Sequence, residues 1–197
     1  MSRIGKTIIT IPSGVSVEFS NGVVVVRGNN GELKQEIKSP ITVVIDGSTV
    51  KVERGNNEAQ SRSLHGLYNR LINNMIIGVS QGFTKTLILN GVGYKAAMKG
   101  ADLGLSLGYA HPSDVKAVSG VKFKVLTPQE IGALNLGKDG IGQVIQVSGA
   151  SKEQVGSVAS MIRDLRPVEP YHLYGIRYSD ERVIRKESKS GAKGGKK

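Results

Sequence analysis

Apolar and polar residues alternate along the N-terminal part of the chain. Turn-forming pairs such as Asn21-Gly22 and Asp46-Gly47 separate the apolar runs, which cover residues 15–19, 23–27, 33–37, 41–45 and 48–53. Period-two alternation places one side chain in two on a core, and Asn-Gly and Asp-Gly are the dipeptides that tight hairpins favour. This part of the chain is therefore predicted to form short antiparallel strands joined by hairpins.

The spacing of apolar residues changes after Asn57. They then recur at three- and four-residue steps, at Leu64, Leu67, Tyr68, Leu71, Ile72, Met75, Ile76 and Val79. This pattern predicts an amphipathic helix, with Asn57 at its N-cap and Gln60 as the capping-box partner.

The opposite face of that helix carries Arg62, Gly66, Asn69 and Asn73. Glycine inside a helix costs roughly 1 kcal/mol relative to alanine, so close approach of a nucleic-acid backbone or a neighbouring chain would account for Gly66. A tolerated glycine on a solvent-facing surface is the alternative.

The second half of the chain repeats this plan. Residues 21–28 correspond to residues 101–108, and Gly55, Asn57, Gln60, Leu64, Tyr68 and Leu71 correspond in order to Gly149, Ser151, Gln154, Val158, Ile162 and Leu165. The two correspondences have different offsets, which places an insertion near residues 127–143. Pro167 and Pro170 are expected to end the second helix. We predict an α+β fold of two duplicated small domains, residues 1–82 and 83–175, each an antiparallel sheet packed against one helix. A basic arm and tail, residues 176–197, would follow.

Charge indicates the kind of partner. The 197 residues include 27 Lys and Arg against 16 Asp and Glu, for a formal net charge of +11. From Arg182 to the C-terminus there are seven basic residues and one acidic residue, Glu187, among glycines and serines that offer little to pack. Such a chain is expected to bind a polyanion, with the tail ordering on it; a merely solubilising tail is the alternative.

Several classes of function can be set aside. No apolar run reaches the roughly 18 residues of a membrane span and the N-terminus lacks a signal sequence, so we expect no membrane and a cytoplasmic location. There are 0 cysteines, which removes disulfides and thiolate chemistry. His65 on a helix flank, His111 in a turn and His172 are too scattered for a metal site and are expected in ordinary surface or capping roles.

Two glycine motifs imitate nucleotide-binding loops. Residues 91–96 fit G-x-G-x-x-A, but another strand-like stretch follows where a helix is required. Residues 132–138 fit most of a P-loop, but Asp139 replaces the Ser or Thr that would hold magnesium. With carboxylates scattered beside basic residues as well, we expect no catalytic residues, no metal and no cofactor.

Aromatic and basic residues mix near the C-terminus. The cluster contains Arg163, Arg166, Tyr171, His172, Tyr174, Arg177, Tyr178, Arg182, Arg185 and Lys186. Such a mixture can stack on bases while neutralising phosphates, although a tyrosine such as Tyr178 could equally cover a domain core.

Motifs along nearly the whole chain resemble the L6 family of bacterial large-ribosomal-subunit proteins. They are Met1 to Lys6, Ile11-Pro12, Leu64-His65-Gly66 through Arg70, Asn74-Met75, Gly78-Val79, Gly91 to Tyr94, Gly108-Tyr109, His111-Pro112, Arg166-Pro167, Glu169-Pro170-Tyr171 and Gly175 to Tyr178. The resemblance implies a non-catalytic protein on 23S rRNA near the stalk base and the sarcin-ricin region. Neighbouring ribosomal proteins and translational GTPases would lie close by.

The resemblance also assigns residues to RNA contacts. The family's RNA-facing arm matches Pro170-Tyr171 and Gly175 to Tyr178, and its Gly-Tyr-basic turn matches Gly93, Tyr94 and Lys95. The family usually has Lys-Gly-Lys where this chain has His172-Leu173-Tyr174, so stacking by Tyr174 is expected to substitute for phosphate contacts. All lines together predict RNA contacts at Arg3, Lys6, Arg62, Gly66, Asn69, Tyr94, Lys95, Arg163, Arg166, Tyr171, His172, Tyr174, Arg177, Arg185, Lys186, Lys189 and Lys193. A free-standing nucleic-acid chaperone and a nucleotide-using enzyme are the alternative functions.

Overall fold

The computed structural model describes residues 4–133 and 142–187 and divides the chain into two compact units. The first unit contains the residues up to Phe83 together with Gly149–Glu153, and the second contains Thr84–Ser148 and the residues from Gln154 onward. Residues 134–141 of the predicted insertion and the predicted RNA contacts Arg3, Lys189 and Lys193 lie outside the described residues.

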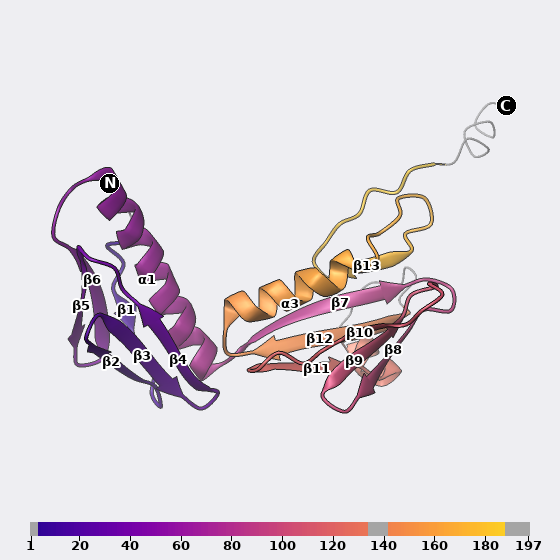
Figure 1. Cartoon of the computed structure of the whole chain (residues 1–197), viewed down its shortest axis with the longest axis horizontal. Coiled ribbons are helices and arrows are strands. Elements are labelled where there is room, and N and C mark those ends of the chain that lie inside the picture. Colours follow the sequence, from indigo (N-terminus) through magenta and orange to yellow (C-terminus); the bar gives the residue numbers. More distant parts are fainter. Residues whose placement is uncertain (1–3, 134–141, 188–197) are drawn as a thin grey trace. The chain divides into compact units, whose positions relative to one another are not determined.

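The first unit has six strands in two antiparallel sheets (Figure 1). They are β1 (Ile9–Thr10), β2 (Ser16–Ser20), β3 (Val23–Gly28), β4 (Gly31–Glu36), β5 (Ile41–Asp46) and β6 (Thr49–Arg54). The sheets have the orders β1-β6-β5 and β2-β3-β4, so the predicted hairpins are confirmed. Pro40 lies between β4 and β5, where the chain leaves one sheet for the other, in keeping with the missing N–H of proline.

Helix α1 (Ala59–Ser80) packs on these strands and forms the core of the first unit (Figure 1). Ile72 and Val79 are fully buried, together with Val24, Val26 and Val50 from the sheets. The amphipathic prediction is therefore confirmed for most of its residues. Leu67 is an exception, because half of its surface is exposed.

The start of α1 differs from the prediction. The N-cap residue is Glu58, whose side chain makes no capping hydrogen bond. Asn57 lies one residue earlier, and its Oδ1 accepts hydrogen bonds from Nε and Nη2 of Arg54. The predicted capping box is wrong, because Arg54 at the end of β6 engages the side chain that would have capped the helix.

The second unit repeats the mixture of strands and helix. Its strands are β7 (Phe83–Asn90), β8 (Lys95–Lys99), β9 (Asp102–Ser106), β10 (Ser113–Val115), β11 (Val121–Val125), β12 (Gln143–Gly149) and β13 (Gly175–Tyr178). They form a sheet of order β10-β9-β8 and a sheet of order β11-β12-β7-β13. Helix α3 (Lys152–Asp164) begins directly after Ser151 and ends before Pro167, as its sequence predicts.

The centre of the four-stranded sheet is buried on both faces. Leu87, Ile88 and Leu89 are consecutive in β7 and all buried, so adjacent residues that point to opposite faces both meet apolar neighbours. Ile88 packs with Leu126 and Val144. Helix α3 contributes a wholly apolar buried face, made of Val155, Val158, Ala159 and Ile162.

A short helix opens the predicted insertion. Helix α2 (Pro128–Ala133) begins with a capping box, because the Glu130 carboxylate accepts hydrogen bonds from the backbone N–H and the hydroxyl of Thr127. Lys124 also binds this carboxylate, and these contacts, Lys124 first, lower the pKa of Glu130 to about 2. The sequence Thr-Pro-x-Glu carries the signal for this helix start.

Candidate nucleic-acid interface

The outward-facing side of α1 is only partly exposed. Arg62 is exposed and Gly66 is half-buried, but Asn69 is 3% exposed. The Asn69 Nδ2 group donates to the carbonyl oxygens of Gly5 and Thr7 at 3.3 and 2.9 Å. The prediction that Asn69 faces RNA is therefore wrong, because the N-terminal segment covers this part of the helix.

His65 belongs to the same anchoring of the N-terminal segment. The residue is 5% exposed and its Nε2 lies 2.8 Å from the carbonyl oxygen of Val52. A carbonyl only accepts, so Nε2 carries the proton, and Nδ1 accepts the longer contact of 3.4 Å from Arg54. A Cβ on Gly5 would lie 2.5 Å from Nδ1, so only glycine fits against the ring. The expected surface role of His65 is wrong.

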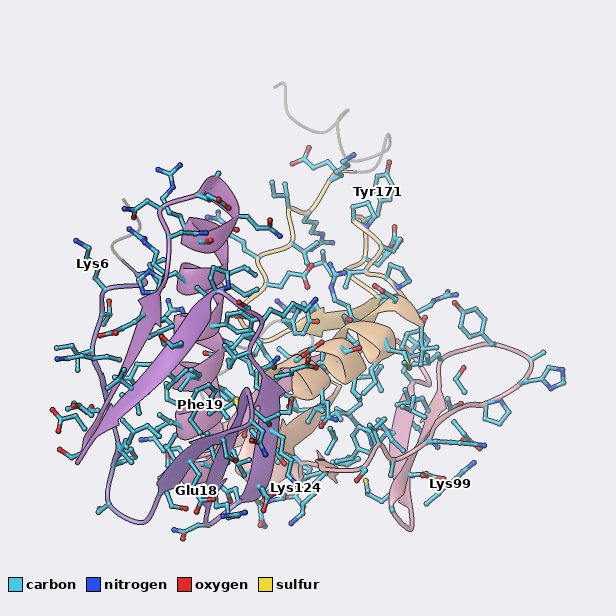
Figure 2. The ribbon with its side chains drawn as sticks, turned by 60° about the vertical axis from the view of Figure 1, so that its left-hand side comes forward. Lys6, Glu18, Phe19, Lys99, Lys124 and Tyr171 are labelled. Atoms are coloured by element: carbon cyan, nitrogen blue, oxygen red, sulfur yellow. The ribbon has the colours of Figure 1, made fainter. Side chains whose placement is uncertain are left out.

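This anchor presents Lys6 to solvent. Gly5 is buried, whereas Lys6 is exposed and its side chain extends away from the first unit in Figure 2. A cation whose backbone neighbours are pinned loses less freedom on binding than one on a loose end. Lys6, Arg62 and Arg70 are exposed cations among the described residues of the first unit that a partner could meet.

In the second unit, Arg166 joins three separate segments. Its Nε donates to the Tyr94 hydroxyl at 3.1 Å, and its guanidinium lies 4.7 Å from the centre of the Tyr109 ring. The Tyr109 hydroxyl in turn donates to the carbonyl oxygen of Leu165. The end of α3, the β7–β8 turn and the β9–β10 loop are thus held together, and Tyr94 and Arg166, predicted separately, are brought into contact.

Arg163 has a partner within the unit. Its Nε and Nη2 donate to the two carboxylate oxygens of Glu181 at 3.0 and 2.7 Å, and its guanidinium lies 5.8 Å from the centre of the Tyr178 ring. The bond from Arg163, helped by the N–H of Tyr178, holds the pKa of the Glu181 carboxyl below its usual range. Arg163 therefore stabilises the second unit, and its predicted contact with RNA stays a prediction.

The segment after α3 returns to the sheet instead of forming a free arm. Gly175 to Tyr178 form β13, which pairs antiparallel with β7 from Asn90 to Leu87. Gly175 has φ +139°, and a Cβ there would lie 2.6 Å from the carbonyl oxygen of Pro167, so this position requires glycine. Ile176 is fully buried and Arg177 is half-buried, its Nη1 donating to the backbone oxygen of Glu181.

The remaining predicted contacts lie exposed on this unit. Six of them are exposed: Lys95, Tyr171, His172, Tyr174, Arg185 and Lys186. Tyr171 is labelled in Figure 2. His172, Leu173 and Tyr174, where the family usually has Lys-Gly-Lys, form an ordered loop described below. The expectation that Tyr178 covers the core is partly met, since its ring is half-buried beneath Lys85 and Arg163.

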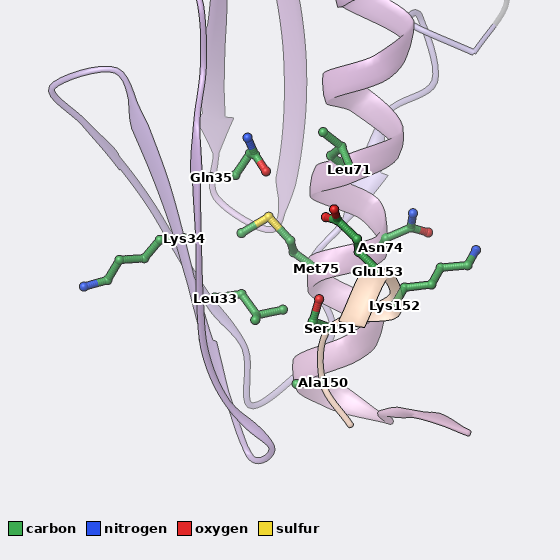
Figure 3. Close-up of a pocket in the computed structure, with 10 residues that line it drawn as sticks. All are labelled: Leu33, Lys34, Gln35, Leu71, Asn74, Met75, Ala150, Ser151, Lys152 and Glu153. Atoms are coloured by element: carbon green, nitrogen blue, oxygen red, sulfur yellow. The ribbon is translucent and has the colours of Figure 1, made fainter. Parts of the chain in front are cut away.

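A cavity of about 340 Å³ in the first unit, shown in Figure 3, is lined by Leu33, Met75 and Lys152 among others. Within residues 4–133 and 142–187 no three His, Cys, Asp or Glu residues are grouped as metal ligands. None of the helices described there is long and apolar enough to cross a membrane.

Known proteins similar to this chain are ribosomal. It is 46% identical over 191 residues to the large ribosomal subunit protein uL6 of Staphylococcus epidermidis, covering 97% of this chain and 99% of the relative. It is 47% identical over 192 residues to the protein of the same name from Clostridium perfringens, with the same coverage. These relatives belong to a class of structural ribosomal proteins and are not enzymes.

The family profile described as Ribosomal protein L6 matches residues 11–82 and again residues 90–179. The chain belongs to the ribosomal protein L6 family. The two matched segments correspond to the two repeats of the sequence, which confirms the duplication, and membership confirms that the chain is not an enzyme.

Proposed function

We propose that this chain is a structural component of the large ribosomal subunit that binds 23S rRNA near the stalk base and the sarcin-ricin region. There it would support subunit assembly and translation in the cytoplasm. Neighbouring large-subunit proteins would contact it, and translational GTPases would act nearby. Family membership is the observation that carries this proposal, and the excess of 27 basic over 16 acidic residues supports a polyanionic partner.

Recognition would rest on the shape of folded RNA. Exposed Lys95, Arg185 and Lys186 and the clamped Arg166 sit on segments fixed by backbone and side-chain bonds. Cations held in this way can meet phosphates at fixed spacing, while backbone groups meet 2′-hydroxyls across shallow minor grooves. The proposed set also contains Arg3, Lys6, Arg62, Gly66, Tyr94, Arg163 and Arg177, with Lys189 and Lys193 in the tail.

The division of labour along the chain is also a proposal. Residues 1–82 and 83–175 would act as two folded bodies that fit the RNA surface. Because β13 belongs to the second sheet, the arm and tail that would thread between RNA helices are the residues that follow β13.

Binding should weaken steeply with salt. Each phosphate neutralised releases counterions, so the logarithm of the affinity should fall linearly with the logarithm of the salt concentration. The double variant Lys95→Ala/Lys186→Ala should bind 23S rRNA more weakly and with a slope shallower by about two, one per lost phosphate contact. Lys122→Ala, an exposed lysine on β11 outside the proposed surface, is the matched control. Equal slopes for the double variant and the wild type would count against this surface.

Two measurements separate the alternatives. Sedimentation of cell extracts should show the chain in large subunits at one copy per particle, whereas a free-standing nucleic-acid chaperone would remain mostly in the light fractions. Titration with ATP or GTP and magnesium should show no binding, and micromolar affinity would support a nucleotide-using protein instead.

A further inference from the structure

Three aromatic side chains stand exposed on one short loop of the second unit, Glu169–Tyr174. Tyr171 is 44% exposed and Tyr174 is 38% exposed, and 69% of the His172 side chain is accessible. The His172 and Tyr174 rings stack on each other, with centres 5.5 Å apart and planes inclined by 23°. The pair therefore presents aromatic surface to solvent instead of contributing to a core.

The loop is held in one conformation by Glu169. The carboxylate accepts hydrogen bonds from the backbone N–H groups of His172 and Tyr171 at 2.9 and 3.1 Å, which lower the pKa of the Glu169 carboxyl, the former most. Across the same loop, the Leu173 N–H donates to the Glu169 carbonyl and the Glu169 N–H donates to the Tyr174 carbonyl. A closed ring of bonds thus fixes the backbone that carries the aromatic pair.

Leu173, between the two stacked residues, has φ +63°, a left-handed conformation that is unfavourable for a leucine. Its carbonyl oxygen accepts a hydrogen bond of 3.1 Å from Nδ2 of Asn90 at the end of β7. A strained residue persists where the contacts around it hold it in place. Here the left-handed conformation of Leu173 turns the chain so that the rings of residues 172 and 174 lie face to face.

Two basic residues border the loop that carries this aromatic pair. The chain returns past the loop after β13, where Arg185 Nε donates to the Tyr171 carbonyl at 3.1 Å and the Lys186 N–H donates to the Pro170 carbonyl at 2.9 Å. Both side chains remain exposed. Sites for unpaired nucleotides combine exposed aromatic faces with nearby positive charge, because a base stacks on the ring while its phosphate contacts the cation.

We propose that the stacked His172 and Tyr174 rings form a docking surface for a single unpaired base of the bound RNA, with Arg185 and Lys186 on the adjoining phosphates. This inference rests on the proposed function and adds the kind of nucleotide that the loop takes. A paired base in a helix offers no free face, so the surface selects a bulged or looped-out nucleotide. The fixed backbone lowers the entropy that binding costs.

The test uses the full chain and a short single-stranded oligoribonucleotide that contains 2-aminopurine, whose fluorescence falls on stacking. Wild type should quench it and bind it more tightly than a fully paired hairpin of equal length. His172→Ala/Tyr174→Ala should bind about tenfold more weakly and lose the quenching, whereas Tyr174→Phe should behave as wild type. His111→Ala, an exposed histidine elsewhere in this unit, is the control.

Three results would overturn the proposal. The first is that the double variant quenches the fluorescence as strongly as the wild type. The second is that the wild type binds the paired hairpin as tightly as the single strand. The third is that the double variant keeps full RNA affinity and loses only a neighbouring protein in assembled subunits. Thermal unfolding of each variant checks the fold, which exposed side chains should barely affect. Binding to 23S rRNA is measured in parallel, so loss of stacking alone and failure of the whole chain to bind ribosomal RNA give different results.

Discussion

The two units hold their terminal segments by different chemistry. In the first unit, buried and uncharged groups on α1, the Asn69 amide and the His65 ring, pin the segment around Gly5. In the second, the exposed end of α3 uses an ion pair, Arg163 with Glu181, to hold the chain that follows β13. Two duplicated helices can therefore anchor a neighbouring segment with bonds that respond differently to salt and pH.

Burial explains the contrast. Every buried residue that α3 contributes is apolar, whereas α1 also buries Ser61, His65 and Asn69. Within the described residues, no buried side-chain nitrogen or oxygen lacks a hydrogen-bond partner. Bonds removed from water should be insensitive to salt, while an ion pair with 37% and 26% of its side chains accessible is screened.

The largest effect is expected from His65→Ala. The change leaves a cavity beside Gly5 and deprives the Val52 carbonyl of its donor, so the free energy of unfolding should fall by about 3 kcal/mol. Urea denaturation measures it, with Arg62→Ala on the exposed side of the same helix as the control. A loss below about 0.5 kcal/mol, the range of ordinary surface substitutions, would contradict the anchor.

Asn69→Ala should cost about 1–3 kcal/mol, because the carbonyl groups of Gly5 and Thr7 lose a buried donor. The N-terminal segment should loosen first, so amide hydrogen exchange at residues 5–10 should speed up more than in the sheets. Asn73→Ala, one turn further along the helix, provides the comparison. Uniform acceleration throughout the unit would mean that Asn69 supports the whole core and not the segment.

Glu181→Gln should have a smaller effect, about 0.5 kcal/mol, because water screens the half-exposed pair. Arg163 lowers the folded-state pKa of Glu181, so the stabilisation is fully present above the unfolded-state pKa of about 4.3 and is lost as pH falls through the lower folded value. Unfolding curves of the wild type and Glu181→Gln should therefore differ at pH 7 and converge in acid. High salt should shrink the difference, while leaving that of Asn69→Ala unchanged. A difference that grows on acidification would refute the assignment.

Local sequence patterns determined much of the secondary structure and the duplication of this protein. Alternating residues and Asn-Gly or Asp-Gly turns predicted the hairpins β2–β3 and β5–β6, and the three- and four-residue spacing predicted α1, because hairpins and helices depend on residues close in sequence. The duplication and the family motifs were readable for the same reason, since both are properties of residue order.

Contacts between distant residues decided the rest. A helical wheel shows that Asn69 lies away from the apolar stripe, but only the folded chain brings Gly5 and Thr7 over it. Likewise the sequence alone shows Arg163 as an unpaired cation, and only the fold brings Glu181 to it. The His172–Tyr174 stack in turn requires the turn at Leu173. Residue order reveals which groups can bind, whereas burial and pairing, which depend on three-dimensional packing, determine which of them remain available to an RNA.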